Sequence, residues 1–137
     1  MDLRILEIAS HTDNNKVLTN PTHNFKNKNP LCGDEMEISL VVKNEIVKEM
    51  GYQCKSCVYC QASVSLLSRK IKNKKVDEIK NFISLSEKIF EDAKFNLSKH
   101  WNDFKELFDK KNISRKECLL LPLRTVLKAL KSNDKNK

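Results

Sequence analysis

Three cysteines spaced three residues apart are the most reactive feature of this sequence. Cys54, Cys57 and Cys60 lie between a run with strand character, residues 35–52, and a run with helical character, residues 61–71. A thiol at such a junction faces unpaired backbone N–H groups and the positive end of the helix dipole, which favour the thiolate. Because thiolate is the form that binds metal or attacks sulfur, we expect metal or sulfur chemistry here.

A second reactive pair lies in the stretch Asn29-Pro-Leu-Cys-Gly-Asp34, which proline and glycine mark as a turn before a strand. Alternate residues of an extended chain point the same way, so Cys32 and Asp34 can face one metal ion. Taken alone, the pair is better explained as a plain turn with a buried thiol.

A predicted hairpin brings the two motifs together. Residues 36–42 alternate, with Met36, Ile38, Leu40 and Val42 on one face, and residues 45–52 form the return strand after a break at residues 43–44. The return strand runs back toward the start of the first, so both motifs are expected at the same end of the sheet.

The rest of the chain predicts helices and one weak edge strand. Apolar spacing indicates helices at residues 2–10, 61–71, 76–95, 99–111 and 119–130 and a strand at residues 22–28. Pro122 is tolerated best in a first helical turn, so the last helix is expected to begin near it. We predict an α+β fold in which a small antiparallel sheet of three strands packs against several helices.

Length and composition bound the class of protein. We expect one domain over residues 1–137, with a helix and loop in residues 1–20 and a frayed tail in residues 131–137. No apolar run has the length of a membrane span and no secretory signal is visible, which predicts a cytoplasmic protein without a membrane partner. Clustered cysteines in a cytosolic chain point to metal binding or catalysis rather than disulfides.

The net charge of +8 has two interpretations. It is compatible with a nucleic-acid surface, but lysines far outnumber arginines and no basic run is interleaved with aromatic residues. We favour solvated lysine-rich surfaces and expect no nucleic-acid partner.

Two metal sites are compatible with the cysteine spacing. A ferredoxin-type cluster on Cys54, Cys57 and Cys60 lacks its further cysteine, since Val64 occupies the expected place. The other site takes three sulfur atoms and one oxygen from separate segments, namely Cys32, Asp34, Cys57 and Cys118. That set suits Zn²⁺ or a [2Fe–2S] cluster with one hard ligand, and the carboxylate predicts easier release than four thiolates.

Three motifs in order resemble the SufU/IscU/NifU family of iron–sulfur cluster assembly proteins, over about residues 20–130. Asn29-Pro-Leu-Cys-Gly-Asp34 resembles N-P-x-C-G-D, and Cys57-Val-Tyr-Cys-Gln-Ala-Ser63 resembles the family's stretch ending in an A-S pair. Ser114-Arg-Lys-Glu-Cys-Leu-Leu120 resembles S-R-x-K-C-x-L, with Glu117 in place of lysine. The long segment between the second and third family cysteines, Cys57 and Cys118, is similar to the SufU branch.

The resemblance implies a SufE/NifU-like fold and a site formed by Cys32, Asp34, Cys57 and Cys118. In such proteins these residues hold zinc or a nascent cluster, and sulfur arrives from a cysteine desulfurase. Ser56 replaces the glycine that usually precedes the second cysteine, and Cys54 and Cys60 are additional to the family triad. These two are small hydrophobic residues, extra sulfur acceptors or alternative ligands; we favour the first for Cys60 and leave Cys54 open.

The leading functional hypothesis is a scaffold that accepts sulfur on Cys118 or Cys57 and passes a labile cluster to apo iron–sulfur proteins. It is a carrier rather than an enzyme, although a sulfurtransferase-like role is compatible with it. One alternative is a zinc protein that stimulates a desulfurase without building clusters, and another is a small metal-stabilised binding module. No nucleophile-elbow motif or glycine-rich phosphate loop supports a hydrolase or redox enzyme.

Overall fold

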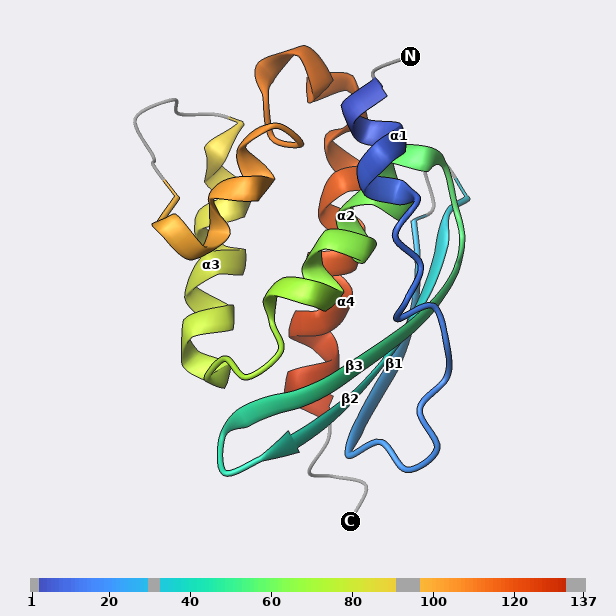
Figure 1. Ribbon diagram of the computed structural model, residues 1–137, viewed down its shortest axis with the longest axis vertical. Helices are drawn as coiled ribbons and strands as arrows, with labels where there is room; N and C mark the ends of the chain where they lie inside the picture. The colour runs from blue at the N-terminus through green and yellow to red at the C-terminus, as the bar shows by residue number, and fades with distance from the viewer. Residues whose placement is uncertain (1–2, 30–32, 91–96, 133–137) are drawn as a thin grey trace.

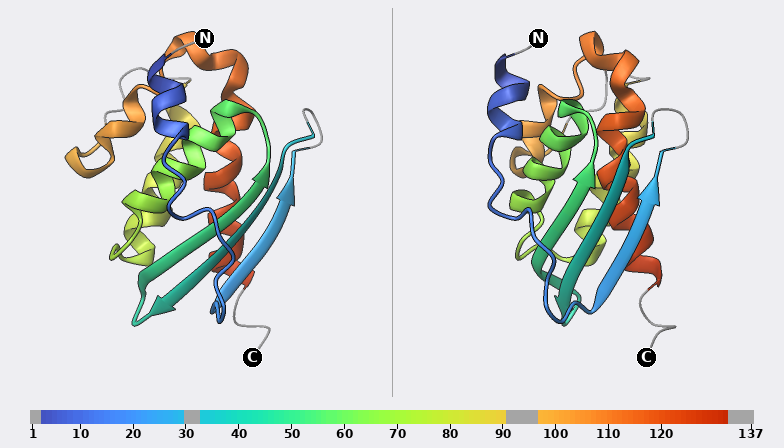
Figure 2. Two further views of the ribbon diagram at one scale, coloured as in Figure 1. Left: turned by 45° about the vertical axis from the view of Figure 1, so that its right-hand side comes forward. Right: turned by 90° about the vertical axis from the view of Figure 1, so that its right-hand side faces the viewer.

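The computed structural model describes residues 3–29, 33–90 and 97–132, in which helices cover one face of a three-stranded antiparallel sheet (Figures 1 and 2). This α+β arrangement confirms the predicted fold class. The elements, in chain order, are α1 (Leu3–Ala9), β1 (His23–Lys28), β2 (Glu35–Lys43), β3 (Ile46–Lys55), α2 (Val58–Lys70), α3 (Val76–Ile89), the 3₁₀ helices η1 (Lys99–Lys105) and η2 (Lys110–Arg115), and α4 (Lys116–Ser132).

The sheet has the order β1-β2-β3, with both pairs antiparallel. The predicted hairpin is confirmed, but its turn lies one residue later than expected, at Asn44 and Glu45. Both have positive φ, 53° and 63°, as the type I′ turn that matches strand twist requires. At the other end, Glu35 pairs with Lys55, so the residue before β2 lies beside the residues after β3.

The helix-facing side of the sheet carries the core. Met36, Ile38 and Leu40 on β2 are buried as the alternation predicted, together with Met50 and Tyr52 on β3. Helix α4 packs against β1 and β2, and α2 packs between β3 and α4. The site-bearing ends of α2 and α4 therefore rest on one rigid layer.

The segment after α1 closes the free edge of β3. The Tyr52 backbone N–H donates to Asn14 O at 3.0 Å, and Leu18 lies over the strand. A Cβ atom on Gly51 would meet Lys16 O at 2.5 Å, so only glycine lets the two backbones approach this closely. An edge covered in this way is protected against pairing with another chain.

Two predicted helices need correction at their starts. Helix α2 begins at Val58 rather than residue 61, directly after Cys57. Helix α4 begins at Lys116, so Pro122 lies inside it and Cys118 lies in its first turn rather than before it. The missing Pro122 N–H costs one helical hydrogen bond, and burial of Leu119, Leu120 and Leu123 offsets that cost.

The helix expected over residues 99–111 is instead the pair η1 and η2. The Asn112 side chain is buried and donates to Glu106 O and Leu107 O, which a continuous helix would pair with its own N–H groups. The Asp109 side chain accepts from the Lys111 N–H and starts a new turn. The aromatic stripe is core as predicted, with Phe82 and Trp101 stacked at 4.1 Å.

Helix α3 ends at Ile89, while the last part of the helix predicted over residues 76–95 lies outside the described residues. The expected helical start at Asp2 also lies outside them. Of the frayed tail expected over residues 131–137, the first two residues instead belong to α4, which ends at Ser132, and residues 133–137 lie outside the described residues. No described helix combines the length and the apolar character that a membrane span needs.

Candidate metal centre

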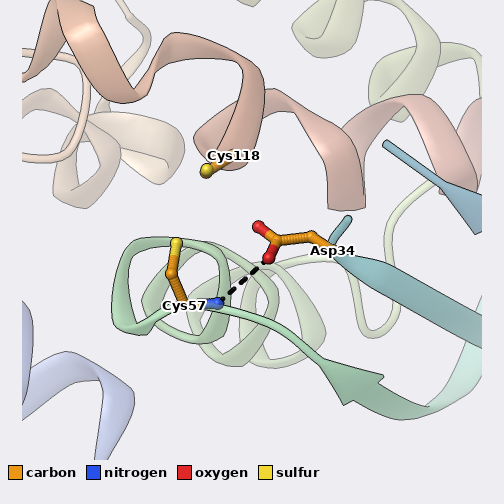
Figure 3. Close-up of side chains that lie close together, drawn as sticks. All are labelled: Asp34, Cys57 and Cys118. Carbon is orange, nitrogen blue, oxygen red and sulfur yellow. Dashed lines mark hydrogen bonds between the residues drawn. The ribbon is translucent and has the colours of Figure 1, made fainter. Parts of the chain in front are cut away.

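Three side chains of metal-ligand type converge at the end of the sheet where α2 and α4 begin. The ligand atoms of Asp34, Cys57 and Cys118 all lie within 4.8 Å of one another. Figure 3 shows the two sulfur atoms and the carboxylate pointing into the same space from three different elements. Residues separated by more than eighty positions thus form one compact donor set.

The hairpin register positions the first two members. Asp34 directly precedes β2, and the Glu35–Lys55 pair sets it beside the turn that leads into α2. The Cys57 N–H donates to Asp34 Oδ1 at 3.3 Å, which orients the carboxylate (Figure 3). Cys57 is the N-cap of α2, and its side chain makes no capping hydrogen bond, so its sulfur is available to a ligand.

The third member is held by helix packing. Cys118 lies in the first turn of α4 and is 5% exposed. Next to it, the buried Ser63 hydroxyl donates to Leu119 O at 2.6 Å and ties α2 to the start of α4. This link fixes the spacing between the elements that carry Cys57 and Cys118.

One buried oxygen indicates that the set is built for a ligand. Asp34 is 7% exposed, and its Oδ2 has no hydrogen-bond partner among the described residues. A buried carboxylate oxygen without a hydrogen-bond donor destabilises the fold, because it loses its hydrogen bonds to water and no protein donor replaces them. A cation bound between the carboxylate and the two sulfurs would remove that cost.

The donor chemistry and spacing fit a tetrahedral metal. Zn–S bonds of about 2.3 Å place two sulfur ligands about 3.8 Å apart. The observed upper limit of 4.8 Å therefore requires a contraction of at most about 1 Å on binding. Two thiolates and one carboxylate suit Zn²⁺ or an iron centre with one hard ligand.

Cys32, the predicted fourth ligand, lies outside the described residues. The ends of its turn are described: Asn29 N–H donates to Asp34 O and Gly33 N–H donates to Asn29 O, both at 2.8 Å. Gly33 has φ +76°, a conformation that favours glycine. The closed turn supports the expected bend before Asp34, and the role of Cys32 stays a prediction.

The structure does not bring Cys54, Cys57 and Cys60 together as a ligand group. In the described part of the chain, the grouped donor atoms are those of Asp34, Cys57 and Cys118. Burial raises the pKa of both the Cys60 and the Cys54 thiols, and the charges of Asp34 and Cys57 raise them further. The preference for Cys60 as a small hydrophobic residue agrees with its complete burial in the core.

Sequence reasoning missed an ion-pair network at the start of α4. Arg124 donates from Nε and Nη2 to the Glu87 carboxylate at 2.7 Å each, and from Nη1 to Glu117 Oε1 at 2.6 Å. Glu117, which stands where the resembled motif has lysine, is thus engaged by Arg124. The seven-residue spacing of Glu117 and Arg124 on one helix was the available signal.

A second missed contact involves residues that lie close in sequence to the two sulfur ligands. The Arg115 guanidinium lies over the Tyr59 ring, 5.2 Å from its centroid. Tyr59 is in the first turn of α2 and Arg115 ends η2, so the pair joins the segments that carry Cys57 and Cys118. This cation–π contact adds about 0.5–1 kcal/mol at an exposed site.

Comparison with known proteins gives a family and several relatives. The family described as NifU-like N terminal domain matches residues 3–100. The iron–sulfur cluster assembly scaffold protein IscU of Thermotoga maritima is 33% identical over 128 residues, covering 93% of this chain and 89% of the relative. The zinc-dependent sulfurtransferase SufU of Bacillus subtilis is 31% identical over 87 residues, covering 62% of this chain and 56% of the relative.

Solved structures share the fold at lower identity. A NifU-like N-terminal protein from Brucella abortus superposes with a TM-score of 0.89 at 20% identity, covering 99% of this chain and 95% of the other. A putative SUF-system scaffold from Fervidobacterium islandicum gives 0.87 at 21% identity, with 95% and 96% covered. With a family match over most of its length and a relative at 33% identity, this chain belongs to the NifU-like N-terminal domain family.

Proposed function

We propose that this protein is a scaffold for iron–sulfur cluster assembly. It accepts sulfur from a cysteine desulfurase, holds a labile cluster as cargo, and passes that cluster to apo iron–sulfur proteins. The observation that carries the proposal is the buried Asp34 oxygen, which has no hydrogen-bond partner among the described residues and faces the thiols of Cys57 and Cys118. The names of the IscU and SufU relatives support the same role.

Sulfur acceptance requires a thiol that an incoming donor can reach. Cys57 is partly exposed at the start of α2, whereas Cys118 is buried, so Cys57 is the better first acceptor. Its thiolate attacks the outer sulfur of a desulfurase persulfide, the donor's S–S bond breaks, and the donor leaves as a thiolate. The sulfur then lies beside Cys118 and Asp34, where incoming iron meets two further ligands.

Asp34 gives the cargo its lability. A carboxylate oxygen is a harder ligand than thiolate and matches a soft cluster less well. A site with one such ligand releases its cluster more readily than four thiolates would. Cys32 is assigned as the remaining ligand on the strength of its place two residues before Asp34.

A zinc-dependent sulfur carrier is the second candidate, favoured by one observation. Two thiolates and a carboxylate around one point are a complete set of protein ligands for a zinc site that keeps an open position. On this alternative the metal holds the acceptor thiolate ready for sulfur, and no cluster is built. A sulfurtransferase activity, and hence an enzyme role, belongs to this candidate.

Anaerobic reconstitution distinguishes the cluster scaffold from the zinc-dependent sulfur carrier. The full chain is treated with iron and sulfide, the cluster is followed by its visible absorbance, and transfer to an apo-ferredoxin is timed. A scaffold forms a cluster that transfers, and Asp34→Asn changes its lifetime while the exposed Asp13→Asn does not. Protein that retains zinc through this treatment and forms no cluster would favour the carrier.

A further inference from the structure

The two sulfur ligands lie at the starts of two helices, and the backbone holds them differently. At Cys57 the helical hydrogen bond is present, since the Gln61 N–H donates to Cys57 O at 3.0 Å. At Cys118 the residue four positions later is Pro122, which lies inside α4 and has no N–H to donate. The helical bond that fixes the backbone of Cys57 therefore cannot form at Cys118.

The proline ring increases this difference. Inside a helix, the ring of a proline presses against the carbonyl group four residues earlier, which here belongs to Cys118. Pro122 is buried, so the surrounding core holds its ring in place. Pro122 thus acts directly on the backbone of a ligand residue, although it lies one helical turn away from it.

Asp34, the third member of the donor set, is anchored as Cys57 is. Its main-chain carbonyl accepts from the Asn29 N–H at 2.8 Å, and β2 begins at the next residue. Its Oδ1 also accepts from the Cys57 N–H at 3.3 Å. Because Asp34 and Cys57 are both held through the backbone, any adjustment of the donor set to a metal falls on Cys118.

Two side-chain contacts keep the first turn of α4 in place without that helical bond. The Ser63 hydroxyl donates to Leu119 O at 2.6 Å, directly after Cys118. Arg124 donates to Glu117 Oε1 at 2.6 Å, directly before Cys118, and so joins the turns on the two sides of the proline. The Arg124–Glu117 pair is partly exposed, and such pairs contribute little free energy, so it permits a small shift of the turn.

We propose that Pro122 is a positioning residue that makes Cys118 the adjustable ligand of the site. The first turn of α4 shifts to bring the Cys118 sulfur onto a bound metal and shifts back on release, while Cys57 and Asp34 stay in place. The movement is small, because the three ligand atoms already lie within 4.8 Å of one another. This inference rests on the proposed function only in that these three residues bind a metal ion or a cluster.

Replacing Pro122 by alanine supplies the missing N–H and is expected to weaken metal binding. The restored hydrogen bond to Cys118 O stabilises the turn in its metal-free position, and it is strained or broken when Cys118 moves. The net contribution of one backbone hydrogen bond corresponds to about a two- to tenfold change in an equilibrium constant. Pro122→Ala should therefore raise the Kd for Co²⁺ and Zn²⁺ by about two- to tenfold, although alanine suits a helix interior better than proline does.

The test titrates metal-free, reduced, full-length protein with Co²⁺ in the absence of oxygen and follows the sulfur-to-cobalt absorbance. The Kd for Zn²⁺ is then obtained by competition, and urea unfolding of the metal-free proteins records stability separately. Pro122→Gly is the matched variant, because it also supplies an N–H but glycine is a much poorer helix former than alanine. Both variants should bind metal more weakly than wild type, whereas an effect of helix stability alone would move their affinities apart.

Hydrogen exchange of the metal-free protein distinguishes the restored bond from a mere loss of packing around the ring. The Leu120 and Leu121 amides lie between Cys118 and Pro122 and should exchange about two- to tenfold more slowly in Pro122→Ala. Loss of packing would make them exchange faster. Should both variants unfold, wild type decides, because its Leu121 amide is expected to be less protected than its Gln61 amide.

Metal binding by both variants that is as tight as in wild type, or faster exchange of the Leu120 and Leu121 amides in Pro122→Ala, would overturn the proposal. Equal protection of the Leu121 and Gln61 amides in wild type would overturn it as well. The probe is the metal ion alone, so the outcome is separable from the proposed function. Protein that binds Co²⁺ but forms no transferable cluster would count against that function and leave this result intact, whereas protein that binds no metal would count against both.

Discussion

Asp34→Asn should move the stability of the metal-free and metal-bound protein in opposite directions. In the metal-free protein Asp34 Oδ2 is buried and unpartnered among the described residues, and its charge lies near the cysteine sulfurs. An unsatisfied buried group costs about 1–3 kcal/mol, and more when it is charged. Asparagine keeps the oxygen that accepts from the Cys57 N–H while removing the charge, so metal-free Asp34→Asn is expected to gain about 1 kcal/mol.

With zinc bound, wild type should instead be more stable than Asp34→Asn. A ligand present at about 100 times its dissociation constant stabilises the native state by about 2.7 kcal/mol. If losing the carboxylate weakens binding about 100-fold, the same zinc concentration stabilises Asp34→Asn by only about 0.4 kcal/mol. With zinc present, Asp34→Asn would then be about 1 kcal/mol less stable than wild type, once its gain of about 1 kcal/mol in the metal-free protein is subtracted from the loss of zinc stabilisation.

Urea unfolding followed by circular dichroism, with a chelator or with zinc, measures both quantities. Asp13→Asn is the matched control, because Asp13 is exposed in the loop after α1 and should respond like wild type. Equal stabilisation of wild type and Asp34→Asn by zinc would refute the ligand assignment. A metal-free Asp34→Asn that is clearly less stable than wild type would refute the reading of Oδ2 as an unsatisfied atom.

Three further predictions concern stability. Gly51→Ala should lower the free energy of unfolding in urea by about 1–3 kcal/mol, because the added Cβ would collide with the backbone of Lys16. Gly33→Asn should change stability little, because no atom lies within 4 Å of the position that a Cβ would take there and asparagine tolerates positive φ. Arg124→Ala should lose about 1 kcal/mol, and added salt should narrow the difference from wild type, as expected for half-exposed ion pairs. Burial raises the pKa of Cys60, so metal-free protein should lose stability as pH rises above about 8.5, where unfolded thiols ionise and the buried one does not. Cys60→Ala should weaken this dependence of the unfolding free energy on pH. A slope in the variant equal to that of wild type would contradict the assignment of the effect to Cys60.

The local sequence pattern was enough to predict the sheet. Alternation on β2 predicted the burial of Met36, Ile38 and Leu40, although Ser39 on the other face is buried as well and Val42 is only partly buried. A tight hairpin fixes which strand ends meet, so the convergence of Asp34 and Cys57 followed from strand length and turn. The helical boundaries were harder. Helix propensity could not reveal that the Asn112 side chain hydrogen-bonds to carbonyl groups that a continuous helix would use. Nor could it reveal that burial of core side chains allows α4 to continue past Pro122.

The sequence by itself determined the donor types, their order and the sheet end at which two of them meet, because strand alternation and hairpin return are properties of short segments. Only the tertiary structure placed Cys118 within reach of Cys57 and left an Asp34 oxygen buried with no partner in the described part of the chain. Those features depend on α4 packing against the sheet and α2, contacts between segments far apart in the chain. The free energy of such contacts comes from burial shared by many residues, and no single motif records it.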